Sequence, residues 1–147
     1  MDYRAIAKQL LDIQPLLRME PINRRLYLLE NGTFLALHYL SEQDKGIHPK
    51  ELSKKMSVST ARIAALLKHM EQEGMIVRKP DHEDNRQITV SLTAYGKQLI
   101  ASKKAEAVTL MAEALEELGW EEAQTYLRIQ RKLLENFLRK KERERQM

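Results

Sequence analysis

Basic and polar side chains that recur along one side of a predicted helix, Thr60–Glu73, have the clearest potential for chemistry. This side carries no acidic residue, and it consists of Thr60, Arg62, Ala65, Lys68, His69 and Gln72. Lysine and arginine can neutralise phosphates, and arginine can also donate two hydrogen bonds to the edge of a guanine. The face is therefore a candidate surface for a polyanion, although an ordinary solvated helix face is the alternative that these residues leave open.

The segment around this helix holds the excess positive charge of the chain. Between Pro49 and Lys79 there are seven Lys or Arg residues and three Glu residues, a net charge of +4 that equals the formal net charge of all 147 residues. A mild excess permits a nucleic-acid partner but does not require one, because a solvated charged surface gives the same count. Lys50, Ser59 and Lys79 complete the candidate binding residues of this segment.

Two short helices separated by a tight turn are predicted to position the basic face. Proline fits the first turn of a helix, so Pro49 is expected to open a helix that ends at Met56. Ser59 is expected to cap Thr60–Glu73, and Gly74 is expected to end it. The apolar side of this second helix comprises Ile63, Leu66, Leu67 and Met70. The segment therefore predicts a helix-turn-helix.

The residues after Gly74 change from a helical period to a period of two. Met75–Arg78 and Gln87–Leu92 are predicted strands, and Pro80–Asn85 is the polar turn that joins them. A helix fits the major groove of DNA, and a neighbouring hairpin can reach the minor groove or the backbone. The order of the elements therefore favours a winged helix-turn-helix that binds double-stranded DNA.

Long helices are predicted on the C-terminal side of this module. Thr93 is expected to cap a helix that runs to about Leu118 and is ended by Gly119. A last helix is expected from about Glu121, with a frayed, charged tail from Arg139 onward.

The N-terminal and C-terminal helices each carry an apolar stripe at helical spacing. The proposed dimerisation residues in these stripes are Ile6, Leu10, Ile13, Leu17, Leu127, Leu134 and Phe137. Pro15 is expected to kink or break the first helix. Stripes this apolar are rarely left exposed on a small monomer, so they favour a homodimer; closure of the stripes over one another within one chain is the alternative.

Together these elements predict a mainly α fold, a winged helix-turn-helix with about six helices, a two-stranded β-hairpin wing, and N- and C-terminal helices for dimerisation. The length favours a single domain over residues 1–147. Within it, residues 33–92 are expected to form the DNA-binding lobe, entered through a turn at Asn31-Gly32. Residues 1–30 and 93–140 are expected to form the helical dimerisation region.

Five short motifs, in matching order and spacing, cover the module from about Ile47 to Gly96. They are Leu52-Ser53-Lys54-Lys55-Met56, Ser57-Val58-Ser59, Glu71-Gln72-Glu73-Gly74-Met75-Ile76-Val77-Arg78, Asp84-Asn85-Arg86 and Leu92-Thr93-Ala94-Tyr95-Gly96. Through them the chain resembles the MarR family of bacterial transcription regulators (multiple-antibiotic-resistance-type regulators). The resemblance implies a DNA-binding homodimer, most often a repressor, in which a small-molecule effector of unknown identity shifts the spacing of two reading heads.

The resemblance also implies roles for residues of the wing. Arg86 occupies the position of the family's wing arginine, which enters the minor groove, where narrow A·T tracts concentrate negative potential. Asp84 matches an acid that holds this arginine or pairs with a strand arginine, here Arg78; a structural ion pair that only shapes the turn is the alternative.

The chain departs from the family where the recognition helix commonly reads Thr-Val-Thr-Arg. Ala64 and Ala65 replace two side chains that could contact DNA, which leaves the operator sequence open and gives unusual weight to Arg62, Lys68 and His69. A second function class stays open for this reason: a winged-helix module that binds protein and has lost DNA specificity.

The composition argues against several other classes. The chain has no cysteine, so disulfides and thiolate metal sites are excluded, and its four histidines are scattered without the spacing of a metal site. No phosphate-binding glycine loop or nucleophile motif indicates an enzyme or a cofactor. The sequence lacks a membrane-length apolar run and a signal peptide, so a cytoplasmic protein without a membrane partner is expected.

Overall fold

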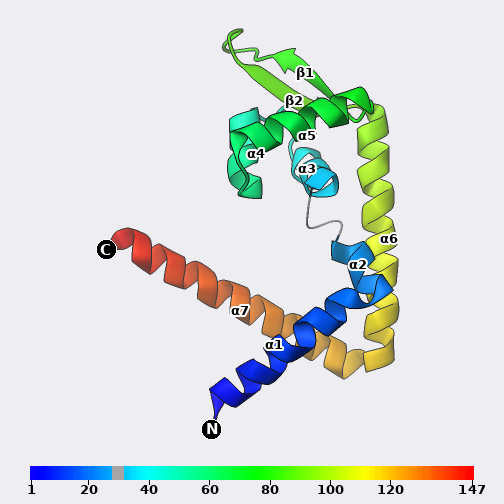
Figure 1. Ribbon diagram of the computed structural model, residues 1–147, viewed down its shortest axis with the longest axis vertical. Coiled ribbons are helices and arrows are strands. Elements are labelled where there is room, and N and C mark those ends of the chain that lie inside the picture. Colours follow the sequence, from blue (N-terminus) through cyan, green and yellow to red (C-terminus); the bar gives the residue numbers. More distant parts are fainter. Residues whose placement is uncertain (28–31) are drawn as a thin grey trace. The chain divides into compact units, whose positions relative to one another are not determined.

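The computed structural model describes residues 1–27 and 32–147, so the expected turn residue Asn31 lies outside the described residues. The chain divides into two compact units, residues 1–107 and 108–147. The elements are α1 (Tyr3–Met19), α2 (Pro21–Tyr27), α3 (Gly32–Ser41), α4 (Pro49–Met56), α5 (Thr60–Gln72), β1 (Ile76–Pro80), β2 (Ile88–Leu92), α6 (Ala94–Leu118) and α7 (Trp120–Gln146) (Figure 1). The mainly helical fold with a two-stranded wing is confirmed.

The described residues contain seven helices, whereas about six were predicted. The additional helix is α2, seven residues long, which begins at Pro21 directly after the extended residue Glu20. Proline suits the first turn of a helix, so the signal was present, but seven residues are too few to show a periodic pattern. The expected division into a DNA-binding lobe and a dimerisation region stays a prediction.

One hydrophobic core holds the helix-turn-helix and the wing together. Its buried members come from α3 to α6, the wing and the connection before α4, and they are Ala36, Leu37, Leu40, Ile47, Leu52, Ile63, Leu67, Met70, Ile76, Val90 and Ile100. Burying one large aliphatic side chain stabilises a fold by about 1.5–3 kcal/mol, so three such residues on α5 fix which side of that helix faces inward. The predicted inner side of α5 is confirmed, with Leu66 only partly buried at its edge.

The wing is an antiparallel hairpin whose strands pair from Ile76 with Leu92 to Pro80 with Ile88. Both strands begin one residue later than predicted, and β1 extends to Pro80. Ile47, in the connection before α4, adds an isolated bridge to Val90 through two backbone hydrogen bonds of 3.0 and 2.8 Å. The wing is therefore tied to the residue that leads into α4.

The junction between the wing and α6 depends on Thr93 and Gly96. Thr93 Oγ1 donates to the carbonyl oxygen of Gly74 at 2.6 Å and accepts from the amide of Gly96 at 3.0 Å, so the predicted N-cap is confirmed. Gly96 is buried, and a Cβ atom built there would overlap the backbone oxygen of Met75. A glycine is needed because the start of α6 lies against the start of the hairpin.

We expect Gly96→Ala to lower the free energy of unfolding by about 1–3 kcal/mol, since the added methyl group must displace backbone. Thermal unfolding followed by circular dichroism should show a melting temperature several degrees below that of the wild type. Lys97→Ala, at the exposed neighbouring position of α6, is the matched control and should melt close to the wild type. An unchanged melting temperature for Gly96→Ala would show that the packing at this junction can relax.

Two expectations about where helices end differ from the structure. The expected break at Pro15 is wrong, because Pro15 lies inside α1, which runs from Tyr3 to Met19; the alternative, a kink at Pro15, stays a prediction. The tail from Arg139 is part of α7, which continues to Gln146. Arg, Lys and Glu are strong helix formers, so a charged composition does not by itself end a helix.

Candidate nucleic-acid interface

The basic face predicted from the sequence lies together on the solvent side of α5. Arg62, Ala65, Lys68 and His69 are exposed on the side of the helix opposite its buried residues, and Thr60 is exposed in the first turn. Neither arginine nor lysine on this face has an ion-pair partner within residues 1–27 and 32–147. The face therefore presents cations that a polyanion could neutralise.

Ser59 has a structural role at the start of this helix. Its Oγ accepts a hydrogen bond from the amide of Arg62 at 3.2 Å, and its carbonyl oxygen accepts from the amide of Ile63 at 3.0 Å. This is the predicted N-cap, and it fixes the first turn of α5, which carries Arg62. Any contact of Ser59 with DNA stays a prediction.

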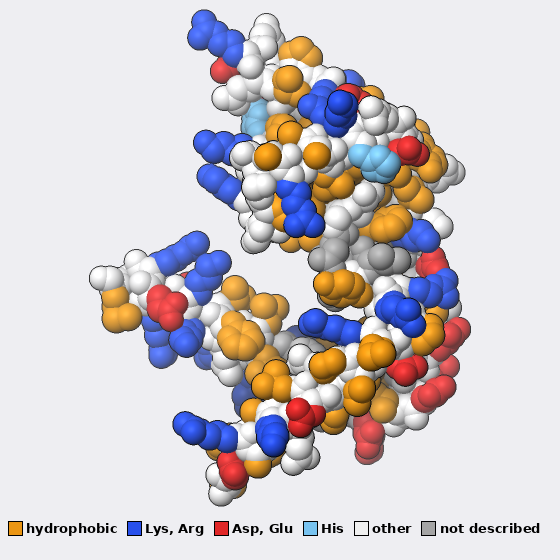
Figure 2. All heavy atoms as spheres, in the orientation of Figure 1, with side chains coloured by type: hydrophobic (Ala, Val, Ile, Leu, Met, Phe, Trp, Pro, Cys, Tyr) orange, Lys and Arg blue, Asp and Glu red, His pale blue; other side chains and the backbone are white. Residues whose placement is uncertain are grey.

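The wing turn and α4 carry a second group of cations around an open cavity. Lys50, Lys54 and Arg86 line a cavity of about 580 Å³ between these two elements. Basic side chains project from α4 and from the wing in Figure 2. Lys79 is exposed on β1 and does not line this cavity. The structure thus brings Lys50 and Arg86 together, whereas Lys79 lies apart from them.

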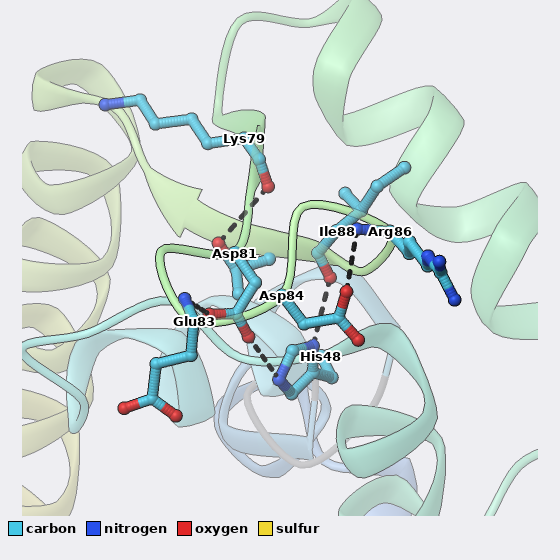
Figure 3. A network of polar contacts seen from close by, with 8 residues as sticks. His48, Lys79, Asp81, Glu83, Asp84, Arg86 and Ile88 are labelled. Carbon is cyan, nitrogen blue, oxygen red and sulfur yellow. Dashed lines mark hydrogen bonds and ion pairs between the residues drawn. The ribbon is translucent and has the colours of Figure 1, made fainter.

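The wing turn is shaped by Asp84. Its Oδ1 accepts a hydrogen bond from the amide of Arg86 at 3.0 Å, and its carbonyl oxygen accepts from the amide of Gln87 at 2.9 Å. The side chain of Arg86 points away from this turn (Figure 3), and its guanidinium has no ion-pair partner among residues 1–27 and 32–147. Asp84 therefore holds the backbone of the wing arginine rather than its guanidinium.

The alternative pairing of Asp84 with Arg78 is wrong. Arg78 Nε lies 3.5 Å from Glu71 Oε2, so its partner comes from the last turn of α5. Arg78 is paired with Val90 within the hairpin, whereas Asp84 lies in the turn beyond the last strand pair. The ion pair of Arg78 joins α5 to the wing, a contact that the residue pattern did not predict.

A second contact that the sequence did not reveal involves His48 and Asp81. His48 Nε2 lies 3.0 Å from Asp81 Oδ2, and His48 Nδ1 lies 3.2 Å from the carbonyl oxygen of Ile88 (Figure 3). The two side chains are far apart in the sequence and carry no spacing signal. They meet only because the wing folds back onto the residue before α4.

The residues predicted to mediate dimerisation are exposed on their helices. On α1 and α7 these side chains are 48–67% exposed, and they are Ile6, Leu10, Ile13, Leu17, Leu127, Leu134 and Phe137. Neither helix contains a buried residue. Exposed apolar surface of this extent marks an interaction site on soluble proteins, so the assignment of these residues to a dimer interface stays a prediction.

Metal binding and membrane insertion are two further possibilities for a helical chain. Residues 1–27 and 32–147 contain no group of three or more His, Cys, Asp or Glu side chains that could hold a metal ion. Among the helices described, none is long and apolar enough to cross a membrane.

Comparison with known proteins places the winged module in one family. Residues 29–88 match the model of the MarR family. The chain is 32% identical over 103 residues to the HTH-type transcriptional regulator YdgJ of Bacillus subtilis, a match that covers 70% of this chain and 61% of that protein. It is 36% identical over 70 residues to the HTH-type transcriptional repressor YetL of B. subtilis, which covers 47% of this chain and 42% of that protein. The chain thus spans less than two thirds of the length of these two relatives.

Solved structures extend the similarity beyond the winged module. A MarR family protein from Bacillus stearothermophilus is 26% identical, with a TM-score of 0.74, and the match covers 94% of this chain and 99% of the other. A point mutant of MepR from S. aureus, bound to an oligodeoxyribonucleotide, is 19% identical, with a TM-score of 0.59 and coverage of 93% and 99%; this likeness concerns the fold alone. The motifs, the winged helix-turn-helix and these matches agree, and the chain belongs to the MarR family of winged helix-turn-helix transcriptional regulators, a family of regulators rather than enzymes.

Proposed function

We propose that this chain is a cytoplasmic repressor that binds double-stranded DNA as a homodimer on a pseudo-palindromic operator and is released by a small-molecule effector. The main observation behind the proposal is that α5 has a buried apolar side and an exposed basic side. Ile63, Leu67 and Met70 are buried, whereas Arg62 and Lys68 face solvent without an ion-pair partner in the described parts of the chain. A helix held in this way can enter the major groove with its cations toward the DNA.

The wing and the relatives support the same proposal. Arg86 lies at the tip of the hairpin with its backbone held by Asp84, where it can reach the minor groove next to the recognition helix. The relative YetL is named a repressor, and the MepR mutant was solved bound to an oligodeoxyribonucleotide. A further MepR structure holds ethidium bromide, which supports a small-molecule effector without specifying its chemistry for this chain.

Selection of bound duplexes from a random pool tests this function. We expect an enriched pseudo-palindrome with half-sites about one helical turn apart, because a two-fold dimer presents two identical recognition helices. Affinity for the enriched duplex should fall steeply with salt, since each phosphate contact releases counterions.

A protein-binding module is the second candidate, and it rests on Ala64 and Ala65. Both are exposed on α5, so two positions of the recognition helix lack a side chain that could reach a base. If the dimer binds no duplex better than random DNA at about 150 mM salt, the repressor proposal fails and this candidate gains support.

Arg62→Ala is expected to change which base is preferred at one position of each half-site, because a bidentate arginine–guanine contact discriminates by about 1–3 kcal/mol. Arg62→Lys is the matched variant: it keeps the charge but cannot form the bidentate contact. Both variants should relax the same position when the selection is repeated. If Arg62→Ala instead lowers affinity equally for all duplexes, and Arg62→Lys restores that affinity, Arg62 contacts a phosphate.

A further inference from the structure

His48 is the N-cap residue of α4, but its side chain makes no capping hydrogen bond. The imidazole faces the wing instead, with Nε2 at 3.0 Å from Asp81 Oδ2 and Nδ1 at 3.2 Å from the carbonyl oxygen of Ile88. The side chains are 36% exposed for His48 and 20% exposed for Asp81. The contact therefore lies at the edge of the protein, where protons exchange readily, yet it is partly shielded from water.

Both groups that face the imidazole are hydrogen-bond acceptors. A backbone carbonyl and a carboxylate have no proton to donate, and a neutral imidazole carries a proton on only one of its nitrogens. The neutral ring can satisfy one of the two contacts but not both. Only the imidazolium form donates to Asp81 and Ile88 at once, so both contacts are hydrogen bonds only when the ring is protonated.

The two acceptors belong to the part of the wing that carries Arg86. Asp81 Oδ1 accepts from the amide of Glu83 at 2.9 Å, and the amide of Asp81 donates to the carbonyl oxygen of Gln87 at 2.9 Å. A contact with His48 thus fixes both arms of the turn relative to α4 (Figure 3).

We propose that protonated His48 is a positioning residue, which holds the wing turn against α4 so that Arg86 is presented to DNA, and that DNA affinity therefore depends on pH. This inference rests on the proposed DNA-binding function. The protonated form donates to both acceptors and the neutral form to only one, so we expect higher DNA affinity with the His48 ring protonated than with it neutral.

Other charged groups face the same space. Helix α4 contributes Lys50, Glu51 and Lys54, and the wing contributes Arg86, all of which line the cavity next to His48. The wing also carries His82 and Glu83 beside Asp81, and the connection before α4 carries Asp44 and Lys45.

Asp81→Asn separates this proposal from a merely structural role. Oδ1 of the asparagine can keep the hydrogen bond from Glu83, and its amide nitrogen then replaces Oδ2 next to His48. That nitrogen donates to Nε2 of a neutral imidazole, whose Nδ1–H still donates to Ile88. The variant therefore keeps the wing in place without the proton.

The experiment compares affinity for the selected operator duplex at about pH 6 and about pH 8, a range over which histidine changes charge. The affinity of the wild type is expected to be roughly three- to tenfold lower at the higher pH. This ratio corresponds to the loss of one charge-assisted hydrogen bond at a partly exposed site. Asp81→Asn should lose this part of the pH dependence and keep only the part that His69 and His82 contribute. Because His69 and His82 are unchanged in this variant, the difference between the profiles isolates His48.

His38→Gln is the matched control, since His38 contacts Glu42, the residue just after α3, and this variant should keep the pH dependence of the wild type. In the DNA-free protein, the ring ¹⁵N resonances of His48 distinguish the imidazolium from the neutral Nδ1–H form, and the proposal requires the imidazolium in the wild type at the pH of higher affinity and the neutral form in Asp81→Asn at about pH 8. Equal pH profiles for wild type and Asp81→Asn, or a neutral wild-type ring at the lower pH, would overturn the proposal. Absence of specific binding at either pH overturns the proposed function itself.

Discussion

Arg86→Ala is expected to weaken binding to the operator by about tenfold or more while the melting temperature changes by no more than a few degrees. The guanidinium projects from the wing turn, and the hydrogen bond that Arg86 makes with Asp84 uses its backbone amide. Alanine keeps that amide, so the turn should survive. What is lost is a cation that can enter the minor groove, where narrow A·T tracts attract arginine most strongly.

Arg145→Ala provides the control for charge. It removes the same charge from the exposed last turn of α7, outside the predicted binding and dimerisation residues, and it should bind as the wild type does. The measurement is a titration of labelled duplex at several salt concentrations, in which Arg86→Ala should also show a shallower salt dependence. Normal affinity in Arg86→Ala would refute the role of the wing arginine.

Local sequence patterns predicted the buried side of α5 and several helix ends correctly, because these features depend on residues that are close together in the chain. The period of α5 fixed its buried side, since residues three and four apart lie on the same face of a helix. Thr93 and Gly74 marked the ends of helices correctly, because caps depend on one or two backbone groups. The family motifs are of this local kind as well, and the comparisons confirmed the resemblance that they carry.

Contacts between segments distant in the sequence could not be predicted in this way. The pairing of Asp84 with Arg78 was wrong because the length of β1 determines how far a strand residue lies from the turn, and β1 extends to Pro80. The contact of His48 with Asp81 depends on the bridge that brings the connection before α4 to the wing. Two backbone hydrogen bonds form this bridge. Every residue type except proline can make such bonds, so the pattern of residue types does not predict where the bridge forms.

Leu134→Glu is expected to convert the dimer into a monomer and to lower operator affinity on the order of a hundredfold or more. Leu134 is 58% exposed on the apolar side of α7, and a carboxylate there would have to be buried without a partner if two copies packed over this side. The monomer keeps its own recognition helix but loses that of the second protomer. In a dimer, binding of the first helix holds the second one close to its half-site, so the second contact forms at a high effective concentration. Light scattering on the eluted protein gives the oligomeric state, and a duplex titration gives the affinity.

Asn136→Glu is the matched control for this change. It adds the same charge two residues further along α7, where the helix has turned by about 200° and Asn136 is exposed on the polar side. The control should remain a dimer with wild-type affinity, so a general effect of negative charge on DNA binding is separated from loss of the second protomer. A dimeric Leu134→Glu would show that this side of α7 is not the interface. A monomeric variant with undiminished affinity would show that one recognition helix and one wing suffice, and the operator would then need no second half-site.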